Sequence, residues 1–133
     1  MVKMHTVYAG GLHCELIHEP SSSKIETDAP KDNLGKGERF SPTDLVGAAL
    51  SSCILTTMAI VAEREGISLV GATAEVVKEM VATPSRRIGS LNVKVQMPSG
   101  VPKEAWEKLK QAAYNCPVKK SIHPDIQAEI SFL

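Results

Sequence analysis

The order of the predicted elements indicates an α+β fold, with antiparallel sheets and helices in separate layers rather than a doubly wound parallel sheet. Three observations predict this class. Strand-like segments stand on both sides of a long apolar segment, an amphipathic helical segment follows them, and a last strand ends the sequence. The 133 residues also predict one domain over residues 1–133, since domains hold about 100–200 residues.

The first forty residues are expected to form β structure. Alternating side chains predict strands over residues 3–9 and 12–18, and the Gly10-Gly11 pair between them predicts a hairpin turn. Residues 24–27 are a possible third strand. The segment 28–40 is rich in Pro, Gly, Asp and Asn, which predicts a long surface connection.

A long helix is predicted to begin after Ser41 and to run to about Glu65. Ser41 is a favourable N-cap, Pro42 suits the first helical position, and Asp44 follows the cap by three residues as a weaker form of the capping box. Gly66 can take the left-handed conformation that ends helices.

The segment 45–62 is uncharged over eighteen residues, which is the lower edge of a membrane-spanning length. Four of these residues are Ser or Thr, and at about 1.5 Å per residue the segment would reach only about 27 Å. Charged residues close it without an aromatic collar, so we expect a buried helix of a soluble protein and no membrane partner. A helix that is apolar on all sides needs more cover than one small domain supplies, which predicts a homodimer.

Two strands, two helices and a last strand are predicted after the long helix. The expected strands span residues 70–81, 88–97 and 125–132, and an amphipathic helix spans residues 102–115. Pro117 predicts a short helix through Ser121 with Cys116 at its N-cap.

The balance of charge argues against nucleic acid as a partner. Fifteen Lys and Arg residues match fifteen Asp and Glu residues, so no basic surplus exists to neutralise phosphates. Only 4% of the residues are aromatic, which leaves few side chains for stacking on bases. The glycines lack the order of a phosphate-binding loop, so nucleotide binding is not predicted either.

The three cysteines, Cys14, Cys53 and Cys116, are an odd number and too few for a disulfide framework, which favours a reducing compartment. The first residues lack an apolar signal core, so we expect a cytoplasmic protein. Neither the cysteines nor the four histidines pair at the spacing of structural zinc ligands, so no metal site is predicted.

Each cysteine has a structural and a chemical interpretation. A free cysteine is often a small buried hydrophobe, and this is the interpretation we prefer for Cys14. Cys53 lies within the long helix and needs a cation or hydrogen-bond donors from elsewhere to become a thiolate. Cys116 has a stronger local argument, because the free N–H groups of a helix start favour a thiolate and Lys119 and Lys120 follow closely.

Two motifs carry a resemblance to a known family. The segment 41–53 (SPTDLVGAALSSC), together with Asn115-Cys116-Pro117-Val118, is similar to the OsmC/Ohr family of thiol-dependent peroxidases. The similarity extends over most of the chain and includes the order of the elements. It implies an OsmC-like fold, in which antiparallel sheets pack around a long central helix that bears a cysteine, and an intertwined homodimer with active sites at the subunit interface.

The resemblance also implies a reaction. Cys53 would be the peroxidatic cysteine that reduces an organic hydroperoxide or hydrogen peroxide, and Cys116 would resolve its sulfenic acid as a disulfide. No bound cofactor is implied. An external thiol reductant, a lipoyl-type dithiol in Ohr-like members, would reopen the disulfide.

The chain departs from the family pattern at the activating residues. Ohr-like members have an arginine in the first β segment and a glutamate ten residues before the peroxidatic cysteine. Here no arginine precedes Arg39, and Thr43 stands ten residues before Cys53. Asp44 would lie about 180° around the helix from Cys53, so we expect it to act as a cap.

Arg39 is therefore the expected activating cation, with Arg86 and Arg87 as alternatives. A solvated loop arginine is the simpler interpretation of Arg39. The leading functional prediction is a homodimeric peroxidase. The alternatives are an OsmC-like small-molecule-binding or redox-sensing protein with the same dimeric fold, and a purely structural dimer.

Overall fold

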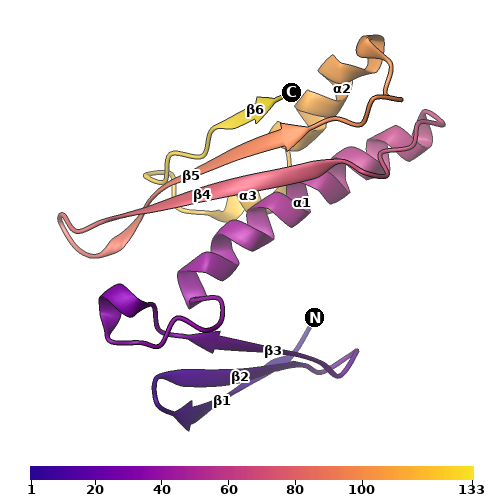
Figure 1. Ribbon diagram of the computed structural model, residues 1–133. Helices are drawn as coiled ribbons and strands as arrows, with labels where there is room; N and C mark the ends of the chain where they lie inside the picture. The colour runs from indigo at the N-terminus through magenta and orange to yellow at the C-terminus, as the bar shows by residue number, and fades with distance from the viewer. The chain divides into compact units, whose positions relative to one another are not determined.

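The computed structural model describes residues 1–133 as two compact units, Met1–Val46 and Gly47–Leu133 (Figure 1). Each unit contains one three-stranded sheet. The elements are β1 (Met4–Gly10), β2 (His13–His18), β3 (Ser23–Asp28), the short 3₁₀ helix η1 (Lys31–Asn33), α1 (Pro42–Arg64), β4 (Thr73–Val81), β5 (Arg87–Gln96), α2 (Lys103–Tyr114), α3 (Pro117–Ser121) and β6 (Ile130–Phe132).

The first unit holds an antiparallel meander in the order β1-β2-β3. The predicted hairpin turn is confirmed, since Gly10 and Gly11 have φ values of 86° and 61°, which glycine adopts without a Cβ clash. Glu15 on β2 lies opposite Glu26 on β3. Side chains alternate along a strand, so the odd-numbered residues of β2 share one face of the sheet and Cys14 points to the other.

The connection after β3 is tied to the sheet at both ends. The backbone N–H of Ala29 donates to the carbonyl oxygen of Leu12 at 3.0 Å, and that of Asp28 donates to the carbonyl oxygen of Phe40 at 3.1 Å. Gly35 approaches the backbone closely, because a Cβ there would clash with the carbonyl group of Ala29. The predicted surface connection is therefore a closed loop that contains η1.

Both ends of α1 follow the sequence prediction. The Ser41 N–H donates to Asp44 Oδ2 at 2.9 Å, and the Asp44 N–H donates to Ser41 Oγ at 3.0 Å, which completes a reciprocal capping box. At the other end Gly66 has a φ of 70°, the left-handed conformation that terminates a helix.

One stripe of α1 enters the core of the second unit. Its buried residues recur every three or four positions, as expected for one helix face: Gly47, Leu50, Ile54, Met58 and Ala62. A Cβ on Gly47 would lie 3.4 Å from the side chains of Leu91 and Val76, so α1 packs closely on the sheet formed by β4 and β5 (Figure 1). By length and composition alone α1 could also cross a membrane, a test that core helices of soluble proteins pass too.

The second sheet has the order β4-β5-β6 and corrects one expectation. β4 and β5 are antiparallel, but β5 and β6 are parallel. The physical reason is the connection between them, which contains α2 and α3 and is long enough to cross over the sheet. The last strand is also shorter than predicted, since Ser90 and Gln127 form only an isolated bridge before β6 begins.

The predicted α+β class, with two sheets and one long cysteine-bearing helix, is confirmed. The two predicted helices after β5 are confirmed as well, and α2 buries Leu109, Ala112 and Ala113. The intertwined homodimer and the description of residues 1–133 as one domain stay predictions.

Candidate functional site

Cys53 lies near the middle of α1, in the second unit. It directly precedes the buried Ile54, so it stands at the edge of the core stripe, and its side chain is half-buried. The Sγ atom of Cys53 is 3.9 Å from Oγ1 of Thr57, one helical turn later. The Cys53 side chain is therefore partly exposed, on a helix whose neighbouring stripe packs in the core.

Cys116 is fully buried at the start of α3. Its backbone is extended and its Sγ accepts a hydrogen bond from the backbone N–H of Lys119 at 3.3 Å. Pro117 occupies the first turn, as the sequence predicts. The predicted N-cap role of Cys116 is confirmed.

The expected ionisation of Cys116 is corrected. Burial raises the pKa of the Cys116 thiol above its ordinary value of 9.0, and this outweighs the Lys119 N–H, which stabilises the thiolate. Side-chain hydrogen bonding to Cys53 and negative charge on Cys53 raise the pKa further, against a small opposite effect of the Val118 N–H. The helix start was expected to favour a thiolate, but complete burial of the sulfur reverses the net direction.

The two sulfurs therefore interact, although 63 positions separate Cys53 and Cys116 in the sequence. Both cysteines are free thiols in the structure. A negative charge on Cys53 makes a second charge on Cys116 unfavourable, as for any closely coupled pair of acids. The half-buried Cys53 and the buried, protonated Cys116 are thus chemically unequal members of one pair.

Thr57 is a site residue that the sequence analysis did not single out. Its hydroxyl is the side-chain group that faces the Cys53 sulfur along α1. The signal was present, because residues four apart on a helix are neighbours on one face. A hydroxyl at this position can donate a weak hydrogen bond to a thiolate.

Arg39 lies in the first unit and is engaged there. Its Nε donates to Glu26 Oε2 at 3.3 Å, and its Nη1 donates to the Glu38 carbonyl oxygen at 3.0 Å. Its role as the activating cation stays a prediction. Of the alternatives, Arg87 donates from Nη1 to the carbonyl oxygen of Ile88 at 3.3 Å.

Cys14 is half-buried on β2, where it lies opposite Tyr8 on β1 and Thr27 on β3. These neighbours suit the expected structural role. No hydrogen bond to the Cys14 sulfur is present in the structure.

A cavity of about 540 Å³ lies beside the second half of α1 and does not include the thiol pair. Its walls are formed by the end of the helix and the following loop: Leu55, Thr56, Ala59, Glu63, Gly66, Ile67, Ser68, Leu69, Val70 and Ala72. Leu55 points about 200° around the helix from Cys53. Thr56, three residues after Cys53, lies only about 60° from it and also lines the cavity, so the cavity extends toward the Cys53 side of α1.

Comparison with known protein families gives one match. A sequence model described as OsmC-like protein matches residues 35–131 of this chain. The matched segment contains α1, both thiols of the pair and the second sheet except for Phe132 at the end of β6. A comparison with curated proteins finds no match.

Solved structures share the fold over the whole chain. The chain is 41% identical to a proposed osmotic stress induced and detoxification response protein from Psychrobacter arcticus 273-4, with a TM-score of 0.94 over 100% of this chain and 96% of that one. It is 19% identical to an organic hydroperoxide resistance protein OsmC from Legionella pneumophila, with a TM-score of 0.79 over 99% and 96%. The OhrB protein of Bacillus subtilis is 16% identical, with a TM-score of 0.72 over 100% and 98%.

Proposed function

The chain belongs to the family of OsmC-like proteins, and from this premise we propose that it is a thiol-dependent peroxidase that reduces organic hydroperoxides, or hydrogen peroxide, in oxidative-stress defence. Structural relatives named as organic hydroperoxide resistance proteins support a redox role in stress. The observation that carries the proposal is the interaction of Cys53 with the buried thiol of Cys116.

In the first step the Cys53 thiolate attacks the distal oxygen of the hydroperoxide. The S–O bond forms as the O–O bond breaks, the peroxide is reduced to an alcohol, and the alkoxide takes up a proton. Cys53 is thereby oxidised to a sulfenic acid. Its half-buried position at the edge of the core stripe suits this role, because the sulfur must meet an external substrate.

In the second step Cys116 attacks the sulfur of the Cys53 sulfenic acid. The S–S bond forms, the S–O bond breaks, and hydroxide leaves as water after taking a proton. Burial suits Cys116 to this role, because a sulfur that solvent cannot reach reacts with its neighbour and not with free peroxide. An external dithiol of the lipoyl type, itself oxidised to a disulfide, would then return both cysteines to thiols.

The proposal includes a homodimer and a cytoplasmic location, and no bound cofactor. The dimer is supported by α1, because only 28% of its most apolar window is buried within this chain. The apolar surface of α1 that this chain leaves exposed would be buried by a second copy of the chain. Arg39 is proposed as the cation that replaces the family's activating arginine.

Peroxide-dependent turnover of the cysteine variants tests the proposal. Consumption of cumene hydroperoxide is measured with dihydrolipoamide as the reductant, on the wild type, Cys53→Ser, Cys116→Ser and the matched control Cys14→Ser. We expect both variants of the pair to lose turnover and Cys14→Ser to retain it. Full activity in Cys53→Ser would refute the proposal.

A second function is favoured by one observation, the presence of Thr43 where Ohr-like members have the activating glutamate. Without that carboxylate the fold could serve as a small-molecule-binding or redox-sensing protein whose thiols react slowly. The two functions differ in the reactivity of Cys53. Oxidation by one equivalent of peroxide within seconds supports the peroxidase, and oxidation over hours supports the sensor or binding protein.

A further inference from the structure

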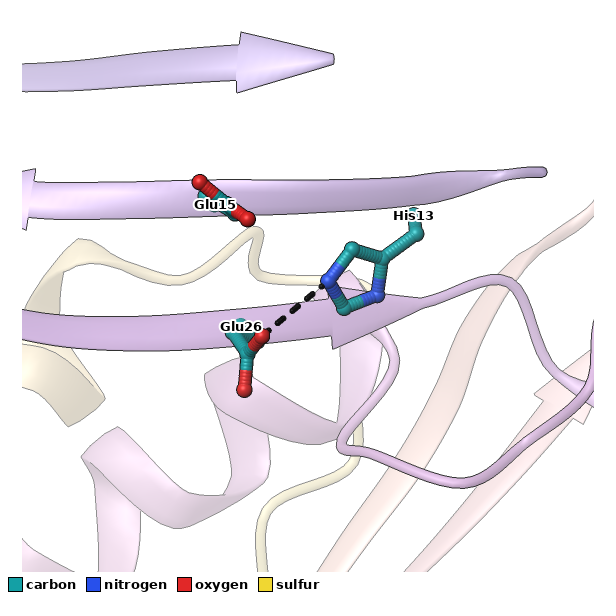
Figure 2. A group of neighbouring side chains, drawn as sticks. All are labelled: His13, Glu15 and Glu26. Carbon is teal, nitrogen blue, oxygen red and sulfur yellow. Dashed lines mark hydrogen bonds and ion pairs between the residues drawn. The ribbon is translucent and has the colours of Figure 1, made fainter. Parts of the chain in front are cut away.

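Four polar side chains of β2 and β3 gather on one face of the first sheet. Figure 2 shows three of them, His13, Glu15 and Glu26. His13 and Glu15 lie on β2, two residues apart and therefore on the same face. Glu26 and Asp28 are their cross-strand partners on β3. This group belongs entirely to the unit Met1–Val46 and is independent of the thiol pair.

Three of these side chains offer ligand atoms in one place. One imidazole nitrogen of His13 and one carboxylate oxygen each of Glu15 and Glu26 lie within 4.8 Å of one another. The His13 Nε2 atom is 3.3 Å from Glu26 Oε1. Ligand atoms bound tetrahedrally at about 2.0–2.1 Å from a metal lie about 3.4 Å apart, so this pair already has the separation of two zinc ligands.

A second layer of contacts holds two of these ligands in orientation. Nδ1 of His13 is 2.6 Å from Oδ1 of the buried Asp28, so the carboxylate holds the proton on Nδ1 and leaves the Nε2 lone pair for the group's centre. Arg39 donates to Oε2 of Glu26, the oxygen that does not face His13. A ligating histidine backed by a carboxylate is the usual outer shell of a metal site.

Glu15 supplies the third argument. It faces Glu26 directly across the ladder, and like charges in that position destabilise a sheet. Arg39 and His13 engage Glu26, whereas no hydrogen bond or ion pair engages the exposed Glu15 carboxylate. A cation between the two glutamates would relieve their repulsion.

We infer that His13, Glu15 and Glu26 form a binding site for one divalent transition-metal cation of the zinc type. The set of one imidazole and two carboxylates favours zinc over magnesium, which prefers oxygen ligands alone. Three protein ligands on an exposed sheet face leave a fourth position open to water. The spacing of cysteines and histidines along the sequence predicts no metal site, but the pairing of β2 with β3 brings together ligands that are distant in sequence.

Zinc binding to the full-length chain tests this inference. Equilibrium dialysis against zinc chloride is performed in a Cys53→Ser/Cys116→Ser background, since thiolates would also bind zinc. We expect one zinc ion per chain, and we expect it to stay bound in excess magnesium. In Glu15→Gln the affinity for zinc should be at least tenfold lower. Glu15 is exposed, so this change should leave the fold intact. The matched control is His5→Ala, which removes an exposed histidine on the same sheet that pairs with Glu19.

Equal zinc affinity in Glu15→Gln and His5→Ala would overturn the inference, as would the absence of zinc binding in the parent. A second measurement covers the case in which the cysteine variants fail to fold. Side-chain ¹⁵N NMR of the wild-type histidines reports where zinc binds, and we expect the Nε2 resonance of His13 to shift on addition of zinc chloride. A His13 resonance unmoved by saturating zinc would contradict the site.

Discussion

The Cys53 sulfur on α1 interacts with the thiol of Cys116, the residue that caps α3, and this interaction adds to burial in raising the pKa of Cys116. A thiolate on Cys53 beside a neutral Cys116 is therefore favoured over two neighbouring thiolates. Burial is the larger cause of the raised pKa, and the hydrogen bond and negative charge of Cys53 add to it. This asymmetry supports the proposed order, in which Cys53 meets peroxide and Cys116 then resolves the sulfenic acid.

Formation of the Cys53–Cys116 disulfide should accelerate as the pH rises. Cys116 must lose its proton to attack, and burial raises the pKa of its thiol above the ordinary value of 9.0. Below that pKa each pH unit changes the thiolate fraction about tenfold. Quenched-flow thiol counting between pH 6 and 9, after a single addition of peroxide, measures this rate. A rate that is constant across this range would contradict the burial effect.

The His13–Asp28 pair should stabilise the first unit within a defined pH window. The Asp28 hydrogen bond raises the pKa of His13 above its ordinary value of 6.5, and His13 in turn lowers the pKa of Asp28 below 3.8. Because the pKa of His13 is raised by folding, protonated His13 stabilises the folded state fully below about pH 6.5. This stabilisation is lost as the pH rises through the pKa of His13 in the folded state. Because the pKa of Asp28 is lowered by folding, ionised Asp28 stabilises the folded state above about pH 3.8. This stabilisation is lost as the pH falls through the pKa of Asp28 in the folded state.

Urea unfolding with EDTA present, so that only protons occupy His13, checks this window. The free energy of unfolding of the wild type should exceed that of His13→Asn most clearly near pH 5, and the difference should shrink by pH 9. His5→Asn is the control, since its ion pair with Glu19 is exposed. A difference that grows with pH would contradict the sign of the linkage.

Removal of the helix cap should destabilise the chain. Ser41→Ala eliminates the Oγ acceptor of the Asp44 N–H, and loss of an N-cap costs about 1 kcal/mol. The control is Ser121→Ala, because the Ser121 hydroxyl bonds a backbone carbonyl at an exposed site. Thermal or urea unfolding measures both variants, and equal stabilities would show that the capping box contributes nothing.

The proposed homodimer should depend on the open faces of α1. Ile60 is 47% exposed on this helix. A charge there would be buried without a partner in a dimer, so Ile60→Lys should shift the chain to monomer. Val77→Lys is the control, because Val77 is similarly exposed but lies on the face of β4 opposite Val76, which contacts α1. Sedimentation equilibrium checks both; a wild type that sediments as a monomer would contradict the proposal.

Much of the fold was predictable because its signals are local. The Gly10-Gly11 turn, the Ser41 cap with Asp44 three residues later, and Gly66 after α1 each place a suitable residue beside the backbone group that needs it. The N-cap position of Cys116 was predictable for the same reason, from Pro117.

What escaped prediction depends on contacts between distant parts of the chain. The parallel pairing of β6 follows from the crossover through α2 and α3, which periodicity cannot reveal. The burial that raises the pKa of Cys116 exists only once α1 and α3 have packed. Likewise, Glu15 and Glu26 meet only through the register of β2 and β3. Thr57 was the exception, since its neighbour Cys53 is four residues away in the sequence.

The most direct test of the proposed cycle is the free-thiol count and intact mass after one equivalent of cumene hydroperoxide, on the wild type and on Cys116→Ser. We predict rapid loss of two of the three thiols in the wild type, with Cys14 retained, and a gain of one oxygen atom at Cys53 in the variant. Three unreacted thiols in the wild type would contradict the assignment of Cys53 and Cys116 as a peroxidatic pair.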